Sequence, residues 1–347
     1  MLHYSNTPSL RFRFEVFALK PNLSGNYIIG ADLGGTNVRT AVTDKQGKIV
    51  GEGRRPSLAM EGAEITISQI VQAVKDAMQD AGVTAKDVCG VGMGVPGRHK
   101  SKEGIVLWSP NFKDWQGLQL LAPISEQLGI ATYMGNDVNV ASLGEYRFGA
   151  GKGVNSMVMM TLGTGIGGGI ILDGKLWLGA NEGGGEIGHQ TVNPGGHKCS
   201  CGNFGDVEAE AGRDAIVQRA ISKIFQGRKT ILSMMVPPKY YDLTPAMISE
   251  AANQGDEVAL ETLQEVGYYV GIAVANAINF INPELFIIGG GISQAGPVLW
   301  DPIMNTVNAI ALTEAMEVCK VVPAALGDDA GIMGGVVLVL QEMESCA

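Results

Sequence analysis

The amino-acid sequence predicts an α/β protein built from two related halves around a central cleft. Two glycine-rich turns indicate this, one within Asp32–Val38 and the other within Thr161–Gly167, and short apolar runs flank both turns. A succession of strand, glycine turn and strand that occurs twice in one chain favours two related units. The rest of the chain alternates between helix-like and strand-like segments, as α/β folds do.

Composition places the chain among globular proteins and excludes several classes of partner. It has 347 residues, 46% of them hydrophobic and 17% charged, which suffices for two buried cores. The net charge of −10, with no run of Lys and Arg longer than two, argues against a nucleic-acid partner. Five cysteines, an odd number, favour a reducing cytoplasm over a disulfide framework.

The first 25 residues are expected to form an extension that is neither a signal peptide nor a membrane anchor. Arg11, Arg13, Glu15 and Lys20 interrupt any apolar stretch there. The uncharged segment Val154–Leu172 approaches the length of a membrane span, but its glycines and threonines make that interpretation poor. We therefore expect a soluble protein without a membrane partner.

The first half begins with short strands and turns between Tyr27 and Val50. Apolar residues at helical spacing predict a helix over Ala63–Ala81, and an apolar run predicts a strand over Val88–Val95 that ends in a Pro-Gly loop. Three further segments follow in order: a helix over Gly117–Leu128, a short strand over Ala131–Met134, and a helix from about Val138 to Phe148.

The second half repeats the arrangement, starting with a strand over Ser156–Thr161. A loop-rich stretch, Asn181–Gly205, carries two histidines and two cysteines. The remaining segments are, in order, helices near Arg213–Phe225 and Val258–Ile281, a strand over Leu285–Ile288, the turn Gly327–Gly331, and an apolar helix to about Leu340.

The paired glycine turns have the chemistry of a phosphate site. Glycine leaves backbone N–H groups bare and threonine offers a hydroxyl, so two such turns could hold a nucleotide triphosphate. Two familiar nucleotide motifs do not apply. Gly163–Gly168 fits G-x-G-x-x-G, but a strand-like run follows it instead of a helix. Gly169–Lys175 approximates a P-loop, but Leu176 replaces the Ser or Thr that would hold magnesium.

Asn136 and Asp137 lie between a short strand and a helix. Asp137 could simply cap the helix, or it could accept a hydroxyl proton as the general base of a phosphoryl transfer. In the second case Asn136 would hold a neighbouring hydroxyl.

The loop after Glu186 has the residues of a metal site. The pattern C-x-C with a histidine ten residues upstream indicates a zinc site formed by His189, Cys199 and Cys201. The fourth ligand would be Asp206 or His197. The alternative is a pair of reduced cysteines in a glycine-rich loop. Glu208 could face the same pocket.

These motifs together resemble those of the ROK family of sugar kinases, most closely its bacterial glucokinases. The resemblance extends from about Tyr27 to the C-terminus and depends on the order of the set. The motifs are Asp32–Thr36, Gly94–Gly97, Ser109–Asn111, Asn136–Asn139, Leu162–Gly167, Glu186–His189, Cys199–Gly202, Gly289–Gly291 and Leu326–Gly331.

The resemblance implies an actin-like ATPase fold of two RNase H-like lobes. Residues 26–137 with about 330–347 would form the small lobe, and residues 138–329 the large lobe. It implies Asp137 as the catalytic base, and substrate contacts from Gly97, Arg98, Asn111, Asn136, Asp137, Glu186, His189 and Glu208. It implies nucleotide contacts from Asp32 beside Mg²⁺, from Gly34, Gly35, Thr36, Asn37, Gly163, Thr164 and Gly165 at the phosphates, and from Gly289, Gly290 and Gly291 near the adenosine.

The zinc loop departs from the family pattern C-x-C-G-x-x-G-C at its last position. Asp206 occupies the place of the final cysteine. A carboxylate oxygen is an acceptable zinc ligand, so the implied set is His189, Cys199, Cys201 and Asp206.

The resemblance implies an ATP-dependent kinase that phosphorylates a hexose at its 6-hydroxyl, with glucose as the expected sugar. Two alternatives remain: a kinase for N-acetylmannosamine, fructose or N-acetylglucosamine, and a sugar-responsive regulator. For the regulator, the residues before Tyr27 are too few for a helix-turn-helix domain. The resemblance also implies a cytoplasmic homodimer or homotetramer. We expect it to use ATP with Mg²⁺ and to hold a structural Zn²⁺.

Overall fold

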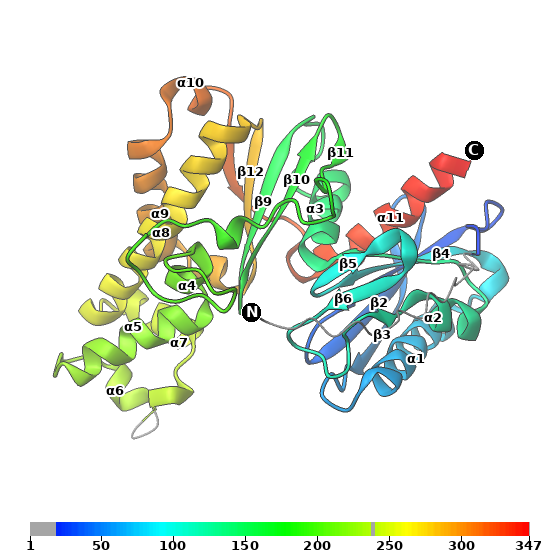
Figure 1. The fold of residues 1–347 in the computed structure, drawn as a ribbon, viewed down its shortest axis with the longest axis horizontal. Helices are drawn as coiled ribbons and strands as arrows, with labels where there is room; N and C mark the ends of the chain where they lie inside the picture. The colour runs from blue at the N-terminus through cyan, green and yellow to red at the C-terminus, as the bar shows by residue number, and fades with distance from the viewer. Residues whose placement is uncertain (1–18, 237–239, 347) are drawn as a thin grey trace, which may run out of the picture.

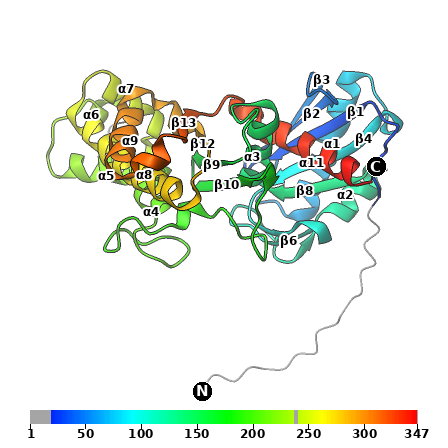
Figure 2. The same ribbon diagram turned by 90° about the horizontal axis from the view of Figure 1, so that it is seen from above.

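The computed structural model describes residues 19–236 and 240–346, so most of the expected extension lies outside the described residues. Two five-stranded sheets occupy the two halves of the molecule (Figure 1). Figure 2 shows the same two halves from above, with helix α3 (Asp137–Phe148) between them.

Both sheets have the same topology. The first has the order β3-β2-β1-β4-β8 and the second β11-β10-β9-β12-β13. In each, three strands form an antiparallel meander, and two further strands add in parallel beside its first member. The strands of the first sheet are β1 (Tyr27–Leu33), β2 (Asn37–Asp44), β3 (Ile49–Pro56), β4 (Val88–Val95) and β8 (Thr132–Asn136). Those of the second are β9 (Met157–Leu162), β10 (Ile166–Leu172), β11 (Lys175–Leu176), β12 (Leu285–Gly289) and β13 (Lys320–Pro323). The prediction of an α/β fold with two related halves is confirmed.

Helices cover these sheets, and a small third sheet extends the first half. That sheet contains β5 (Arg98–Lys100), β6 (Ile105–Trp108) and β7 (Leu118–Gln119). The helices are α1 (Ala63–Ala81), α2 (Leu121–Leu128), α3 (Asp137–Phe148), α4 (Val207–Ala211), α5 (Arg213–Phe225), α6 (Leu232–Met235), α7 (Pro245–Asn253), α8 (Glu257–Ile281), α9 (Pro297–Ile310), α10 (Thr313–Met316) and α11 (Ala330–Cys346).

The predicted helix over Gly117–Leu128 is wrong in its first part. Residues 118 and 119 form strand β7, because Leu118 pairs with Val106 of β6, and the helix begins only at Leu121. Gly117 has a φ of 68°, which a right-handed helix does not allow. The final helix also runs past Leu340, to Cys346.

The C-terminal helix α11 packs into the first half of the molecule (Figure 1). Glycines make this approach possible. A Cβ on Gly30 of β1 would overlap the carbonyl oxygen of Ile332, and a Cβ on Gly92 of β4 would overlap that of Gly335. The backbones of helix and sheet are therefore in direct contact, which joins the last seventeen residues of the described chain to its first strands.

Each half has its own hydrophobic core. One lies between the first sheet, α1 and α2, and the other between the second sheet and helices α5, α7, α8 and α9. Among residues 19–236 and 240–346, no helix combines the length and the hydropathy that crossing a bilayer requires.

The contact between α11 and β4 predicts an unusual response to a glycine-to-alanine change. Alanine is the better helix former by about 1 kcal/mol, so propensity alone would make Gly335→Ala stabilising. Because the added Cβ meets the Gly92 carbonyl, we expect the free energy of unfolding in urea to fall by about 1–3 kcal/mol. Gly195→Ala, at a loop position with open space, should leave it unchanged. Unaltered stability in Gly335→Ala would refute the close contact.

Candidate active site

The first glycine turn connects the adjacent ends of β1 and β2. Leu33 and Val38 are paired across the hairpin, and the Gly34 N–H donates to the Asn37 carbonyl at 2.9 Å. Gly35 and Thr36 are exposed at its tip. The turn therefore presents small residues and backbone amides to the space beyond the sheet.

The second glycine turn has the equivalent position in the second sheet. Leu162 pairs with Ile166, and the Gly163 N–H donates to the Gly165 carbonyl at 3.0 Å. The Gly163 carbonyl accepts from the N–H of Arg213, so the first residue of α5 lies against this turn.

A cavity of about 460 Å³ combines part of the predicted nucleotide site with the predicted base. Its walls include Asp32, Asp137 and Thr161. The other predicted residues that line it are Gly34, Gly35, Thr36, Asn37 and Gly290. The lining does not include the remaining predicted nucleotide residues, Gly163, Thr164, Gly165, Gly289 and Gly291. Two of the glycines after β12 nevertheless lie against β9: Gly289 pairs with Thr161, and a Cβ on Gly290 would overlap Leu162.

Asn136, and not Asp137, is the N-cap of α3. Its Oδ1 accepts from the N–H groups of Val138 (3.0 Å) and Asn139 (3.2 Å), and its Nδ2 donates to the Gly97 carbonyl at 3.3 Å. Asp137 is the first residue of the helix, and its carboxylate accepts from the N–H of Val138 at 3.0 Å. The capping explanation for Asp137 therefore falls away, because its neighbour already supplies the cap.

Sequence reasoning missed a basic residue and two acids beside this cavity. Arg39 lies opposite Asp32 across the β1–β2 pair, and its guanidinium donates to the Asp328 carbonyl and to the Asp329 carboxylate, each at 2.7 Å. Arg39 and Asp328 both line the cavity. The hairpin register was the available signal for Arg39. The contact with Asp328 joins residues 289 positions apart and had no local signal.

Apart from Asp137, the predicted sugar contacts lie outside the lining of this cavity, on several different elements and loops. Asn111 is exposed and lies beside Gly35, and Arg98 is exposed at the start of β5. Gly97 has a φ of 108° and contacts the Asn136 side chain. Glu186 precedes the short 3-10 helix Ile187–His189. The Glu208 carboxylate accepts from the N–H of Ile166 at 3.0 Å, directly after the second glycine turn.

The predicted metal ligands form one cluster. The donor atoms of His189, Cys199, Cys201 and Asp206 all lie within 4.8 Å of one another. His189 Nδ1 is 3.6 Å from the Cys199 sulfur and 3.5 Å from an Asp206 oxygen, which is 3.0 Å from the Cys201 sulfur. Ligands of a tetrahedral zinc ion stand about 3.4–3.8 Å apart, so the type and spacing of these donors are compatible with zinc. His197 is not in the cluster: its ring contacts Glu210 at 2.9 Å.

Comparison with known proteins identifies the family. The ROK family model matches residues 28–342. The chain belongs to the ROK family.

Curated relatives of this ROK protein include kinases and repressors. Glucokinase of Halalkalibacterium halodurans is 34% identical over 93% of this chain and 98% of its own length. A xylose repressor of Caldicellulosiruptor bescii is 30% identical over 94% of this chain and 81% of its own length. Among solved structures, the ROK glucokinase of Streptomyces griseus in complex with glucose and AMPPNP has a TM-score of 0.78 and 34% identity, over 91% of this chain and 99% of that one.

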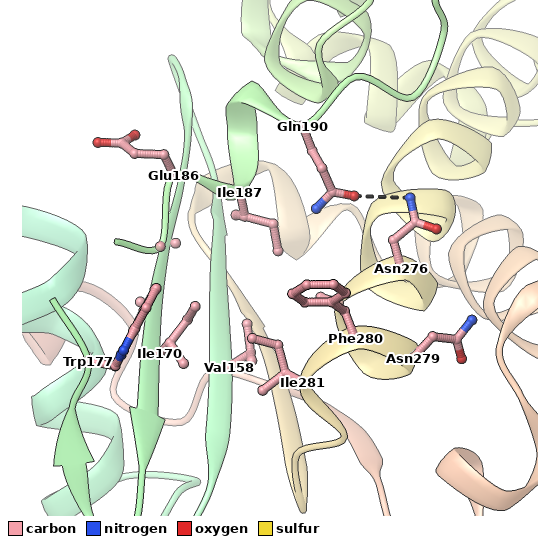
Figure 3. A pocket seen from close by; sticks show the side chains of 14 residues that line it. Val158, Ile170, Trp177, Glu186, Ile187, Gln190, Asn276, Asn279, Phe280 and Ile281 are labelled. Carbon is pink, nitrogen blue, oxygen red and sulfur yellow. Dashed lines mark hydrogen bonds between the residues drawn. The ribbon is translucent and has the colours of Figure 1, made fainter. Parts of the chain in front are cut away.

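A larger cavity of about 630 Å³ lies elsewhere in this ROK protein, between the second sheet and the end of α8 (Figure 3). Its walls are mainly apolar, with Trp177, Ile187 and Phe280 among them. Asn276 donates to Gln190 at its upper side. Glu186 is at its edge, but its carboxylate points away from the cavity (Figure 3). The lining has no cation for a phosphate, so the smaller cavity is the better candidate.

Two of the three acids that line the smaller cavity, Asp32 and Asp137, have raised pKa values. Burial raises the pKa of Asp32 to about 6, the charges of Asp137 and Asp328 act in the same direction, and Arg39 opposes them. Burial also raises the pKa of Asp137, and the charge of Glu186 adds to this, against hydrogen bonds that favour the carboxylate. Raised carboxyl pKa values in a cleft are typical of functional sites.

This coupling predicts that Asp137→Asn lowers the pKa of Asp32. Removing a negative neighbour makes the charged form of Asp32 less costly, so its pKa should fall below about 6, while burial, the larger cause, keeps it above the ordinary value. Carboxyl ¹³C shifts followed against pH would measure it. Asp76, whose pKa the Arg55 side chain holds low, is the internal control and should not move. An unchanged Asp32 titration in the variant would show that the two acids are not coupled.

Proposed function

We propose that this protein is an ATP-dependent hexokinase that transfers the γ-phosphoryl group of ATP to the 6-hydroxyl of glucose, with Asp137 as the general base. The observation that carries the proposal is the place of Asp137, in one cavity with the first glycine turn and free of a capping role. Glucokinases that match nearly all of this chain support glucose as the acceptor.

On the nucleotide side, the chain's contribution is charge neutralisation and positioning. The amides and hydroxyl of Gly34–Thr36 would bind phosphate oxygens, and Gly163–Gly165 would approach from the other half. Gly289–Gly291 would lie near the adenosine. Mg²⁺, held beside Asp32, supplies neutralisation of phosphate charge when bound.

On the acceptor side, Asp137 accepts the proton of the attacking hydroxyl. Its raised pKa makes it a stronger base than an ordinary carboxylate. Asn136 is held by Gly97 and would orient a neighbouring hydroxyl. The remaining sugar contacts in the proposal are Gly97, Arg98, Asn111, Glu186, His189 and Glu208. We further propose that two lobes close on the sugar, one formed by residues 26–137 with 330–347 and the other by residues 138–329. Closure would exclude water, which otherwise competes with the sugar hydroxyl for the phosphoryl group.

We propose a structural Zn²⁺ on His189, Cys199, Cys201 and Asp206. Its support is the cluster of four donor atoms and the complete burial of Asp206, since a buried carboxylate needs partners. A metal there would fix the loop that carries Glu186 and His189. We also propose that the protein is a cytoplasmic homodimer or homotetramer and that it has no nucleic-acid partner.

The test is an ADP-release assay with ATP and Mg²⁺ across glucose, fructose, mannose, N-acetylglucosamine and N-acetylmannosamine. We expect the highest kcat/KM with glucose. A higher value with an amino sugar would make the protein a different ROK sugar kinase. Because the matched relatives include xylose repressors, xylose belongs in the panel. No ADP release with any sugar would overturn the kinase assignment and favour a sugar-responsive regulator.

A further inference from the structure

Glu210, a buried acid with no role in the proposed chemistry, contacts the loop that carries the cysteines. It is fully buried in α4, four residues after Asp206. One of its oxygens accepts from the backbone N–H of His197 at 2.8 Å and from the side-chain amide of Asn193 at 3.2 Å. The other contacts the His197 ring at 2.9 Å and the guanidinium of Arg219. Its charge is thus compensated by the loop on one side and by a cation on the other.

Arg219 of α5 contacts Glu210 on the side away from the loop. Its Nε donates to the main-chain carbonyl of Glu210 at 3.3 Å, and its Nη1 donates to Glu265 of α8 at 2.9 Å. The guanidinium also stacks on the Tyr269 ring at 5.1 Å, and the Tyr269 hydroxyl accepts from Asn193 at 3.3 Å. Helices α4, α5 and α8 therefore all take part in holding this one carboxylate.

The loop gripped by Glu210 carries two of the metal ligands. The segment 193–197 leads directly to Cys199 and Cys201, and the Gly205 N–H donates to the His197 carbonyl at 2.7 Å at the base of the loop. On the other side, the Glu210 N–H donates to the Asp206 carbonyl at 3.0 Å, within the same helical turn. The contact is tight, because a Cβ on Gly196 would overlap a Glu210 oxygen.

We propose that Glu210 and Arg219 form a positioning clamp for the metal-binding loop. The clamp holds segment 193–197 so that Cys199 and Cys201 lie against His189 and Asp206 before a metal arrives. This inference rests on the zinc site proposed above, and it assigns to Glu210 no contact with sugar, nucleotide or metal. Residues that orient metal ligands typically change metal affinity about 10- to 100-fold when altered.

The chain offers a closely matched pair of variants for the test. Gly196→Ala pushes the loop away from Glu210, whereas Gly195→Ala adds the same methyl group one residue earlier, where no atom lies within 4 Å. Neither glycine has a positive φ. A second pair removes the charge of an acid that contacts Arg219. Glu210→Gln alters the clamp directly, whereas Glu265→Gln alters the contacts that Arg219 and Lys223 make on the side away from the loop.

The measurement is competition for Zn²⁺ between the metal-stripped full chain and a chromogenic chelator, with far-UV circular dichroism and melting of the metal-free forms to establish folding. We expect Gly196→Ala and Glu210→Gln to bind zinc about 10- to 100-fold more weakly, while Gly195→Ala and Glu265→Gln match the unaltered chain. If Glu210→Gln does not fold, Gly196→Ala decides alone, since its side of the contact is a surface loop.

Full zinc affinity in a folded Gly196→Ala variant would overturn the clamp and leave the zinc site standing. If the unaltered chain binds no zinc, the zinc site fails and the clamp fails with it. In both cases the ADP-release assay with glucose is read separately, so neither result is confused with failure of the kinase assignment.

Discussion

The close packing of α11 against the first sheet is the constraint on which the candidate site depends. Backbone meets backbone at Gly30 and Gly92, which leaves no room for side chains. The start of α11 is thereby fixed beside β1, and a Cβ on Gly331 would overlap the Asp32 side chain. The same helix packs on α3, where the Gly334 backbone contacts the Val140 carbonyl. Asp137 is thus held close enough to raise the pKa of Asp32 by a helix that begins almost two hundred residues after Asp137.

Local signals were sufficient to predict much of this fold. The helix over Ala63–Ala81, the strand over Val88–Val95 and the helix over Arg213–Phe225 have the predicted bounds, because periodic apolar residues and flanking glycines mark each of them. The prediction of a helix over Gly117–Leu128 was wrong in its first part because pairing with β6 makes residues 118 and 119 a strand. Periodicity within a segment carries no information about a partner strand. For the same reason the family resemblance could indicate Asp137, while the contact of Arg39 with Asp328 required the folded chain.

Three acids on or beside the short helix α4 connect parts of the proposed site that are separate in sequence. Asp206 belongs to the metal cluster, Glu208 accepts from the first residue of β10, and Glu210 holds the loop before the cysteines. Residues two apart on a helix point to nearly opposite sides, so Glu208 and Glu210 contact different segments. A displacement of α4 would therefore alter the metal cluster, the second glycine turn and the loop together.

In the proposed mechanism Asp137 acts as the base and does not serve mainly to bind the sugar. The most direct measurement compares turnover and glucose affinity in Asp137→Asn, with Asp214→Asn on the exposed surface of α5 as the control. If Asp137 is the base, turnover falls about 10²- to 10⁴-fold while the calorimetric Kd for glucose stays close to that of the unaltered protein. Turnover near that of the control, or loss of glucose binding with turnover kept at saturation, would contradict it.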